Sequence, residues 1–239
     1  MSADAPEHGP AARVQSPPIR DAATIVLVRD GDTASPRVLM GQRGAGAAFM
    51  PSKYVFPGGA IDPGDRRIAL ASPLPASEIA RLSQQPVTKT CPPPEAMAAA
   101  AVRELWEESG LRLGRPGPWI GPVPEDWAGF AETGLVPAGD GLRFIFRAVT
   151  PPGRPRRFDA RFFLARAEDI VGDLDDFSRA TDELSHLHWI PLAEARALDL
   201  PFITEVVLAE AEALVLEGLQ DSVPFFDNSS GESVFRRLA

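Results

Sequence analysis

The chain has 239 residues, of which 44% are hydrophobic, and a formal net charge of −9. This length and composition fit one well-buried domain and make two full domains unexpected. The acidic balance argues against a nonspecific nucleic-acid surface, which needs clustered Lys and Arg, although small phosphorylated ligands stay open. Cys91 is the single cysteine, so no intrachain disulfide is expected and a reducing, cytoplasmic setting is favoured.

The N-terminal residues 1–20 are rich in Ala and Pro, and we expect a disordered leader there. They lack a basic region followed by an apolar core, so no signal peptide is predicted. No apolar run reaches the roughly 18 to 20 residues that a membrane span needs. The C-terminal residues do not match the Ser-Lys-Leu peroxisomal signal. We therefore expect a single domain over 21–220 and a C-terminal tail over 221–239.

The first elements of the domain are short strands. Apolar runs at 22–29 and 37–42, joined by Asp30-Gly31-Asp32, predict a β-hairpin. Residues 53–56 predict a third strand, which ends in a loop rich in Gly and Pro. The segment 66–94 has the composition of a surface excursion, with a short helix expected at 76–85 and Ser77 as its cap.

A helix is predicted from about Glu95 to Ser109, and it carries three carboxylates on one face. Glu104, Glu107 and Glu108 stand at i, i+3 and i+4, about 5 to 6 Å apart. Three like charges this close favour raised pKa values or a bound cation, and oxygen ligands suit Mg²⁺ or Mn²⁺. For an isolated helix, a solvated acidic face is the commoner explanation of such a pattern.

The second half of the chain alternates strands and helices. We expect a short helix at 124–133, paired strands at 142–149 and 157–165, and a further strand at 186–190. A helical segment at 191–195 and a long amphipathic helix at 201–219 follow. Strands interleaved with two principal helices indicate an α/β fold.

Two segments together resemble the signature of the Nudix hydrolases. That signature is a Gly, five residues, a Glu, seven residues and then Arg-Glu-apolar-x-Glu-Glu-x-Gly-apolar. Gly59 to Asp65 fits its first spacing, with Asp in place of Glu, and Glu95 to Leu111 fits its second half. Asp65 and Glu95 compete for the leading acid, so an insertion of roughly 30 residues splits the motif. Similar insertions mark the RP2-type peroxisomal coenzyme A diphosphatases, which 49–52 and 156–163 also resemble.

The resemblance implies a fold, a reaction and a set of site residues. The fold is an α/β/α sandwich with a mixed sheet, and the reaction is metal-dependent hydrolysis of a phosphoanhydride in a nucleoside diphosphate linked to another moiety. The implied Mg²⁺ or Mn²⁺ ligands are Glu104, Glu107, Glu108 and the backbone near Gly59, with Arg103 orienting the carboxylates. The identity of the general base is left open between these glutamates and Glu183. The alternative for Glu183 is an acid on a surface turn without a catalytic role. Glu95, about half a turn out of phase with Glu104, is assigned a structural role.

Substrate phosphates need cations, and the candidates are Arg43, Lys53, Arg156 and Arg157, with Arg154 and Arg161 as further choices. The resemblance implies CoA or acyl-CoA as substrate, cleaved to 3′,5′-ADP and 4′-phosphopantetheine. ADP-ribose or a dinucleotide is an alternative with the same chemistry. A noncatalytic ligand sensor is an alternative of a different class. No nucleic acid or membrane partner is expected, and assembly as a homodimer is left open.

Overall fold

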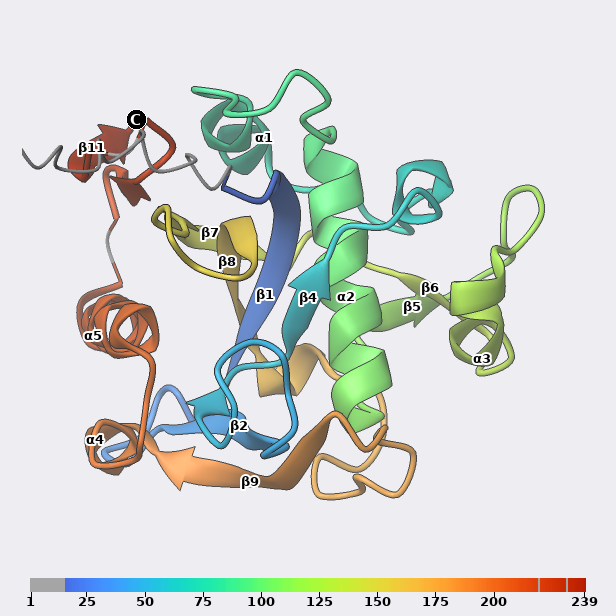
Figure 1. Ribbon diagram of the computed structural model, residues 1–239. Coiled ribbons are helices and arrows are strands. Elements are labelled where there is room, and N and C mark those ends of the chain that lie inside the picture. The colour runs from blue at the N-terminus through green and yellow to red at the C-terminus, as the bar shows by residue number, and fades with distance from the viewer. Residues whose placement is uncertain (1–15, 219, 231) are drawn as a thin grey trace, which may run out of the picture.

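The computed structural model describes residues 16–218, 220–230 and 232–239. Its centre is a mixed nine-stranded sheet, in the order β11-β10-β7-β8-β1-β2-β3, with β4 paired to β1 and β9 to β2 (Figure 1). These strands are β1 (Ile19–Arg29), β2 (Arg37–Arg43), β3 (Tyr54–Val55), β4 (Gly58–Ala60), β7 (Arg143–Val149), β8 (Arg157–Arg166), β9 (Leu184–Pro191), β10 (Val223–Asp227) and β11 (Val234–Leu238). A second, two-stranded sheet pairs β5 (Gly114–Pro116) with β6 (Leu135–Pro137).

Helices cover both faces of the large sheet. The helical elements are α1 (Ala76–Leu82), α2 (Pro94–Ser109), α3 (Ala128–Ala131), α4 (Leu192–Ala195) and α5 (Phe202–Glu217), with 3₁₀ turns η1 (Asp65–Arg67), η2 (Glu125–Trp127) and η3 (Ala167–Asp169). Alternate side chains of β1 point to opposite faces, so Ile25 joins the core under α2 and Val26 the core under α5. The predicted α/β/α sandwich is confirmed.

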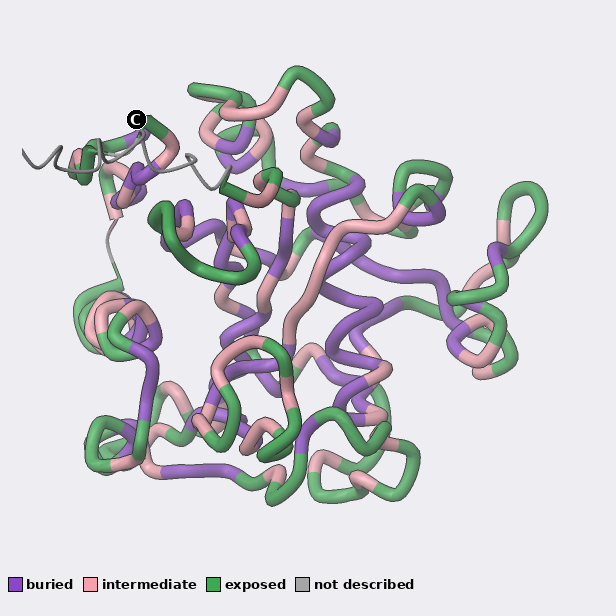
Figure 2. Tube along the Cα trace, viewed as in Figure 1, coloured by how far each residue is buried: buried purple, intermediate pink, exposed green. Residues whose placement is uncertain are grey.

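Helix α2 is buried along nearly its whole length (Figure 2). Its four alanines Ala98–Ala101 are fully buried, and such small side chains let the helix lie close to the sheet. It ends at Gly110, whose φ of 77° gives the left-handed C-cap that glycine adopts without strain. Glu104 and Glu108 are buried as well, so they do not belong to a solvated helix face.

The segment 66–94 is not the surface excursion that its composition indicates. Ile68, Leu74 and Leu82 are buried in the core beneath α2. The predicted helix is present as α1, but its N-cap position is Pro75 with no side-chain cap, so the assignment of Ser77 was wrong. Buried Glu78 accepts a hydrogen bond from the backbone N–H of Phe144 at 3.0 Å, which joins α1 to β7.

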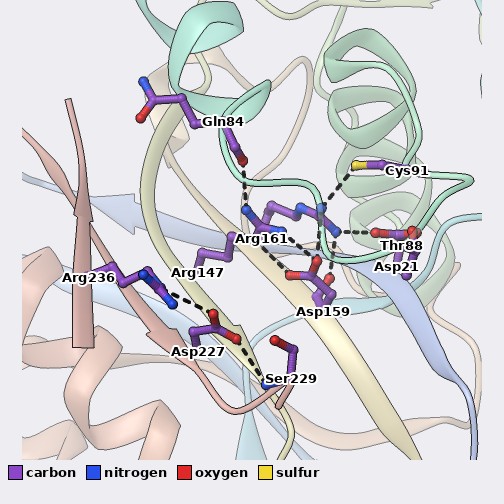
Figure 3. Close-up of polar contacts among 10 residues, drawn as sticks. All are labelled: Asp21, Gln84, Thr88, Cys91, Arg147, Asp159, Arg161, Asp227, Ser229 and Arg236. Carbon is purple, nitrogen blue, oxygen red and sulfur yellow. Dashed lines mark hydrogen bonds and ion pairs between the residues drawn. The ribbon is translucent and has the colours of Figure 1, made fainter. Parts of the chain in front are cut away.

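A buried charge cluster also joins this segment to the sheet (Figure 3). We call Asp21, Arg147, Asp159 and Arg161 the balanced network, because two guanidinium groups meet two carboxylates. Arg147 donates to both oxygens of Asp159 at 2.8 and 2.7 Å, and Arg161 donates to Asp21 at 2.5 Å. Three of these residues also contact the segment. Arg147 donates to the carbonyl of Gln84, Asp21 accepts from the hydroxyl of Thr88, and Arg161 donates to the thiol of Cys91.

The C-terminal segment, expected to be a tail, belongs to the domain. Strand β10 pairs in parallel with β7 and β11 pairs with β10, so these residues extend the large sheet. An ion pair between Arg236 and Asp227, at 3.2 Å, links the two strands (Figure 3). At the other end, β1 begins at Ile19, so the last residues of the leader predicted for 1–20 belong to the sheet, while 1–15 lie outside the described residues. Within the described part of the chain, no helix is both long and apolar enough to cross a membrane.

Candidate active site

Arg103, in the middle of α2, organises the carboxylates around it. It is 3% exposed, and each of its five N–H groups donates a hydrogen bond. Two go to Asp65 at 3.0 and 3.1 Å, one each to Glu104 at 2.9 Å and Glu107 at 3.0 Å, and one to the carbonyl of Ala60 at 2.9 Å. A planar guanidinium held at five points fixes its neighbours in one geometry.

Of the two candidates for the leading acid of the signature, Asp65 is the one that contacts Arg103. It is 1% exposed, and besides Arg103 it accepts hydrogen bonds from the indole of Trp127 at 3.1 Å and the backbone of Asp62 at 2.9 Å. Glu95 is exposed at the start of α2. The role of leading acid therefore falls to the residue before the insertion, and the structural assignment of Glu95 fits its position.

Glu104 and Glu108 lie against the glycines of β4. A Cβ added to Gly59 would come within 2.5 to 2.6 Å of the carboxylate of Glu104, so only glycine lets that carboxylate approach. Glu108 accepts the backbone N–H of Gly58 at 2.8 Å through one oxygen. Its other oxygen is buried and has no hydrogen-bond partner among the described residues.

Burial raises the pKa values of Glu104, Glu107 and Glu108. For Glu104, burial, opposed by Arg103 and assisted by the charge of Glu107, raises the pKa to about 7. For Glu108, burial and the charge of Glu104 raise the pKa well above its ordinary value. Burial also raises the pKa of the partly exposed Glu107, against the opposing charge of Arg103. The single charge of Arg103 therefore does not neutralise all the carboxylates around it.

A divalent cation fits these carboxylates in charge and in donor type. The unpartnered oxygen of Glu108 would gain a partner, and the cost of burying two adjacent acids would be offset. The described residues contain no ready-made group of three or more Asp, Glu, His or Cys side chains arranged to hold a metal, and Glu107 is bound by Arg103. Glu104 accepts a hydrogen bond from the same guanidinium, but it is buried near Glu108, whereas Glu107 is partly exposed. Glu104 and Glu108 are therefore the better-placed pair, and Glu107 fits the ligand set less directly.

A cavity of about 1000 Å³ opens in front of these carboxylates. It is lined by nine of the predicted site residues: Arg43, Lys53, Gly59, Arg103, Glu104, Glu107, Glu108, Arg156 and Glu183. Arg154 lines it too, as does Arg20, which the sequence did not single out. No described residue of 66–94 lines this cavity, so the segment does not form its wall.

Two of the arginines considered as phosphate ligands lie elsewhere. Arg157 is buried and donates to the carbonyls of Thr150 at 3.0 Å and Asn228 at 2.9 Å, because the alternation of β8 turns it away from the cavity face. Arg161 belongs to the balanced network. Their assignment as substrate ligands is therefore corrected to a structural one. Lys53 lines the cavity but is paired with Asp199.

The fold and the carboxylates around Arg103 agree with the resemblance to Nudix hydrolases, and so does comparison with known proteins. The crystal structure of a NUDIX hydrolase from Alicyclobacillus acidocaldarius aligns with a TM-score of 0.60 and 29% identity, over 83% of this chain and 96% of that one. The chain is therefore similar to Nudix hydrolases in both sequence and fold.

Two named relatives are similar in sequence. The Caenorhabditis elegans protein named nudix hydrolase 7 is 29% identical over 72% of this chain, and the Gallus gallus acyl-coenzyme A diphosphatase NUDT19 is 28% identical over 62%. These alignments cover 51% and 55% of the relatives, so the chain spans about half of their length. No family model matches the chain.

Proposed function

We propose that this protein hydrolyses the diphosphate linkage of a nucleoside diphosphate joined to a second moiety, with Mg²⁺ or Mn²⁺ as cofactor. The observation that carries the proposal is the unpartnered, buried oxygen of Glu108 beside Glu104, both facing a cavity of about 1000 Å³. When bound, a divalent cation supplies charge neutralisation at the diphosphate and lowers the pKa of the attacking water.

Each side chain of the site has a separate task in this proposal. Glu104 and Glu108 hold the metal, with Glu107 and the backbone near Gly59 as the further predicted ligands. Arg103 keeps Glu104 in place through its hydrogen bond. Arg43 receives a substrate phosphate, because it lines the cavity and its buried Nε has no hydrogen-bond partner among the described residues. Glu183 lines the same cavity and is our candidate for the general base.

CoA or acyl-CoA is the proposed substrate class. A cavity of about 1000 Å³ lies at the upper end of the usual range for ligand sites, about 300 to 1,000 Å³, and so admits a large ligand. The sequence similarity to an acyl-coenzyme A diphosphatase supports the same choice. Arg154 and Arg156, exposed on the turn between β7 and β8, offer cations to a third phosphate.

A substrate panel tests the reaction. Purified protein is incubated with CoA, lauroyl-CoA, ADP-ribose or a diadenosine polyphosphate, each with Mg²⁺ or Mn²⁺, and the products are resolved by mass. We expect 3′,5′-ADP and 4′-phosphopantetheine from CoA. A large preference for ADP-ribose or the dinucleotide would overturn the substrate class and leave the diphosphatase reaction standing. Binding without turnover of any compound would favour a noncatalytic sensor.

The recognition of the third phosphate has its own test. CoA should exceed dephospho-CoA in kcat/KM by about tenfold, since a charge-assisted hydrogen bond to a phosphate contributes on the order of 1.5 to 3 kcal/mol. Arg156→Ala should remove most of that preference. Arg157→Ala is the matched control, because its guanidinium binds backbone carbonyls. Its expected effect is a lower melting temperature with the preference retained.

A further inference from the structure

Residues 171–183, between η3 and β9, form a loop that lies against the C-terminal end of α2 (Figure 1). We call it the β9 loop. The backbone N–H of Thr181 in this loop donates to the carbonyl of Glu107 at 2.9 Å. That carbonyl is one of the last four of α2, which have no hydrogen-bond donor within the helix. The loop therefore completes the hydrogen bonding of the helix end that carries Glu107 and Glu108.

Arg179 packs against the same end of α2. Its Cζ lies 5.7 Å from the centroid of the Trp106 ring, within the range of a cation–π contact. A Cβ added to Gly110 would come within 3.0 Å of the Cβ of Arg179, so the glycine leaves room for the loop. Helix α2 has no basic residue in its last turn. Arg179 therefore brings a positive charge to the negative end of the helix dipole.

Glu183 stands between two backbone anchors. On one side is the hydrogen bond from Thr181 to α2. On the other side, Leu184 begins β9, is buried, and pairs with Arg43 of β2. Only residues 182 and 183 lie between the anchors, and Glu183 lines the main cavity together with the carboxylates of α2. The place of this carboxylate in the site therefore depends on how the end of the loop meets the helix.

The first half of the β9 loop has contacts of its own. The N–H of Val171 donates to the carbonyl of Arg112 at 2.9 Å, and the carbonyl of Leu174 accepts the indole N–H of Trp189 at 3.0 Å. These contacts hold the loop on the domain at the end farther from Glu183. They do not determine how the last turn of the loop approaches α2.

We propose that Arg179 is a positioning residue for Glu183, the candidate general base. The contact of Arg179 with Trp106 holds the loop on α2, and the hydrogen bond of Thr181 then sets Glu183 beside the carboxylates of the site. Arg179 does not reach the substrate in this proposal, because it lines a separate pocket of about 410 Å³ at the end of α2. The inference rests on the proposed function.

A double-mutant cycle tests whether Arg179 acts through Glu183. The kcat and KM are measured with Mg²⁺ for CoA, or for ADP-ribose if the substrate panel favours it. We expect Glu183→Gln to lower kcat about a hundredfold, within the range for a general base. Arg179→Gln should lower kcat about tenfold with KM within about twofold. The double variant should match Glu183→Gln within about twofold, because both changes affect one function.

Two further arginine variants separate positioning from a general loss of packing. Arg179→Lys keeps the positive charge over the ring of Trp106 and should keep kcat within about threefold of the wild type. Arg112→Gln is the matched control, because Arg112 lines the same small pocket. Its guanidinium packs on Gly172, at the start of the loop. We expect this variant to keep the kcat of the wild type.

Amide hydrogen exchange in chelator, without substrate, tests the docking of the loop independently of turnover. The N–H of Thr181 should exchange at least about tenfold faster in Arg179→Gln than in the wild type, because local opening releases its hydrogen bond. The N–H of Val171 at the start of the loop should exchange at the same rate in both proteins. Unchanged exchange at Thr181 would overturn the role of Arg179 in holding the loop.

The kinetic outcomes separate this inference from the proposed function. Equal losses of kcat from Arg179→Gln with and without Glu183→Gln would overturn the positioning role and leave the hydrolysis in place. Normal kcat in Glu183→Gln would do the same, since Glu183 would then have no part in the rate. A wild-type protein that hydrolyses no compound of the substrate panel would overturn the proposed function and this inference together.

Discussion

Two buried charge clusters in this domain differ in how completely the protein neutralises them. In the balanced network, two arginines meet two aspartates (Figure 3). Around Arg103, a single guanidinium serves Asp65, Glu104 and Glu107, while Glu108 beside them has no arginine partner within ion-pair distance among the residues that the structure describes. Arg147, Asp159 and Arg161 are as buried as Arg103, Asp65 and Glu108, so depth alone does not separate the two clusters.

This difference in charge balance indicates which cluster needs a proton or a bound cation. A buried pair that closes on itself can hold strands and the segment 66–94 together without any ligand. Carboxylates in excess of their partners carry a desolvation cost, which a proton or a bound cation relieves. The raised pKa values of Glu104 and Glu108 are the sign of that cost. Charge imbalance thus distinguishes the candidate active site from the structural cluster.

Removing the central carboxylate of the balanced network should have the largest effect on stability. Asp159→Asn leaves Arg147 and Arg161 with only Asp21, and the loss expected from breaking a buried pair is about 3 to 5 kcal/mol. Urea denaturation measures it. The control is Asp175→Asn, which breaks the exposed pair with Arg29 and should cost less than about 1 kcal/mol. Equal stability of the two variants would contradict the distinction between the clusters.

The opposite outcome is expected for the carboxylates around Arg103, namely Asp65, Glu104, Glu107 and Glu108, which we call the unbalanced cluster. Glu108→Gln should lower kcat at least about a hundredfold, or roughly 2.7 kcal/mol in the transition state, while the metal-free protein melts at the same or a higher temperature. The amide keeps the size of the side chain and removes the buried charge. Glu95→Gln changes an exposed acid on the same helix and should retain activity. Near-normal turnover by the Glu108 variant would refute the metal-ligand assignment.

The helix and its acids were predictable from the sequence because their information is local. The spacing of Glu104, Glu107 and Glu108 fixes a common face once the helix is assumed, and Gly110 marks its end. The paired strands β7 and β8 were predictable for the same reason. The choice between Asp65 and Glu95 was not, because it depends on how the chain between them closes.

Contacts distant in sequence account for the errors. The pairing of β10 with β7 joins residues about 80 positions apart, and a short apolar run near the C-terminus does not reveal its partner. Arg157 was assigned to substrate because its type suits phosphate, whereas the alternation of β8 decides which face it takes. Trp127 could have been suspected only as a tryptophan beside an acidic loop, a weak signal.

The stability of the metal-free protein should fall as the pH rises. The pKa of Glu104 is raised from its ordinary value to about 7 in the folded protein, so the folded state binds the proton more tightly. The resulting stabilisation is present below the ordinary pKa of about 4.5 and is lost as the pH passes the folded value. Between pH 5 and 7 the loss is on the order of 2 kcal/mol.

Melting curves in chelator measure this dependence. Glu104→Gln should flatten it, and Mg²⁺ or Mn²⁺ should restore stability at pH 7 and above by replacing the proton. Glu95→Gln should leave the slope unchanged. A metal-free melting temperature that rises from pH 5 to pH 7 would show that the carboxylates are compensated within the protein, and the contrast between the clusters would fail.

The smallest change in kcat is expected for Trp127, which contacts the unbalanced cluster through Asp65. Its indole N–H donates to Asp65, and Asp65 holds Arg103, so the ring acts on the glutamates as a positioning residue. Trp127→Phe should reduce kcat about five- to tenfold, or about 1 kcal/mol, with KM little changed. Trp119→Phe is the matched control, since Trp119 packs 5.8 Å from Trp127 but donates to the carbonyl of Leu135. Both variants should lose stability through the lost ring volume, and only the first should lower kcat. Equal losses of kcat would show that Trp127 serves packing alone.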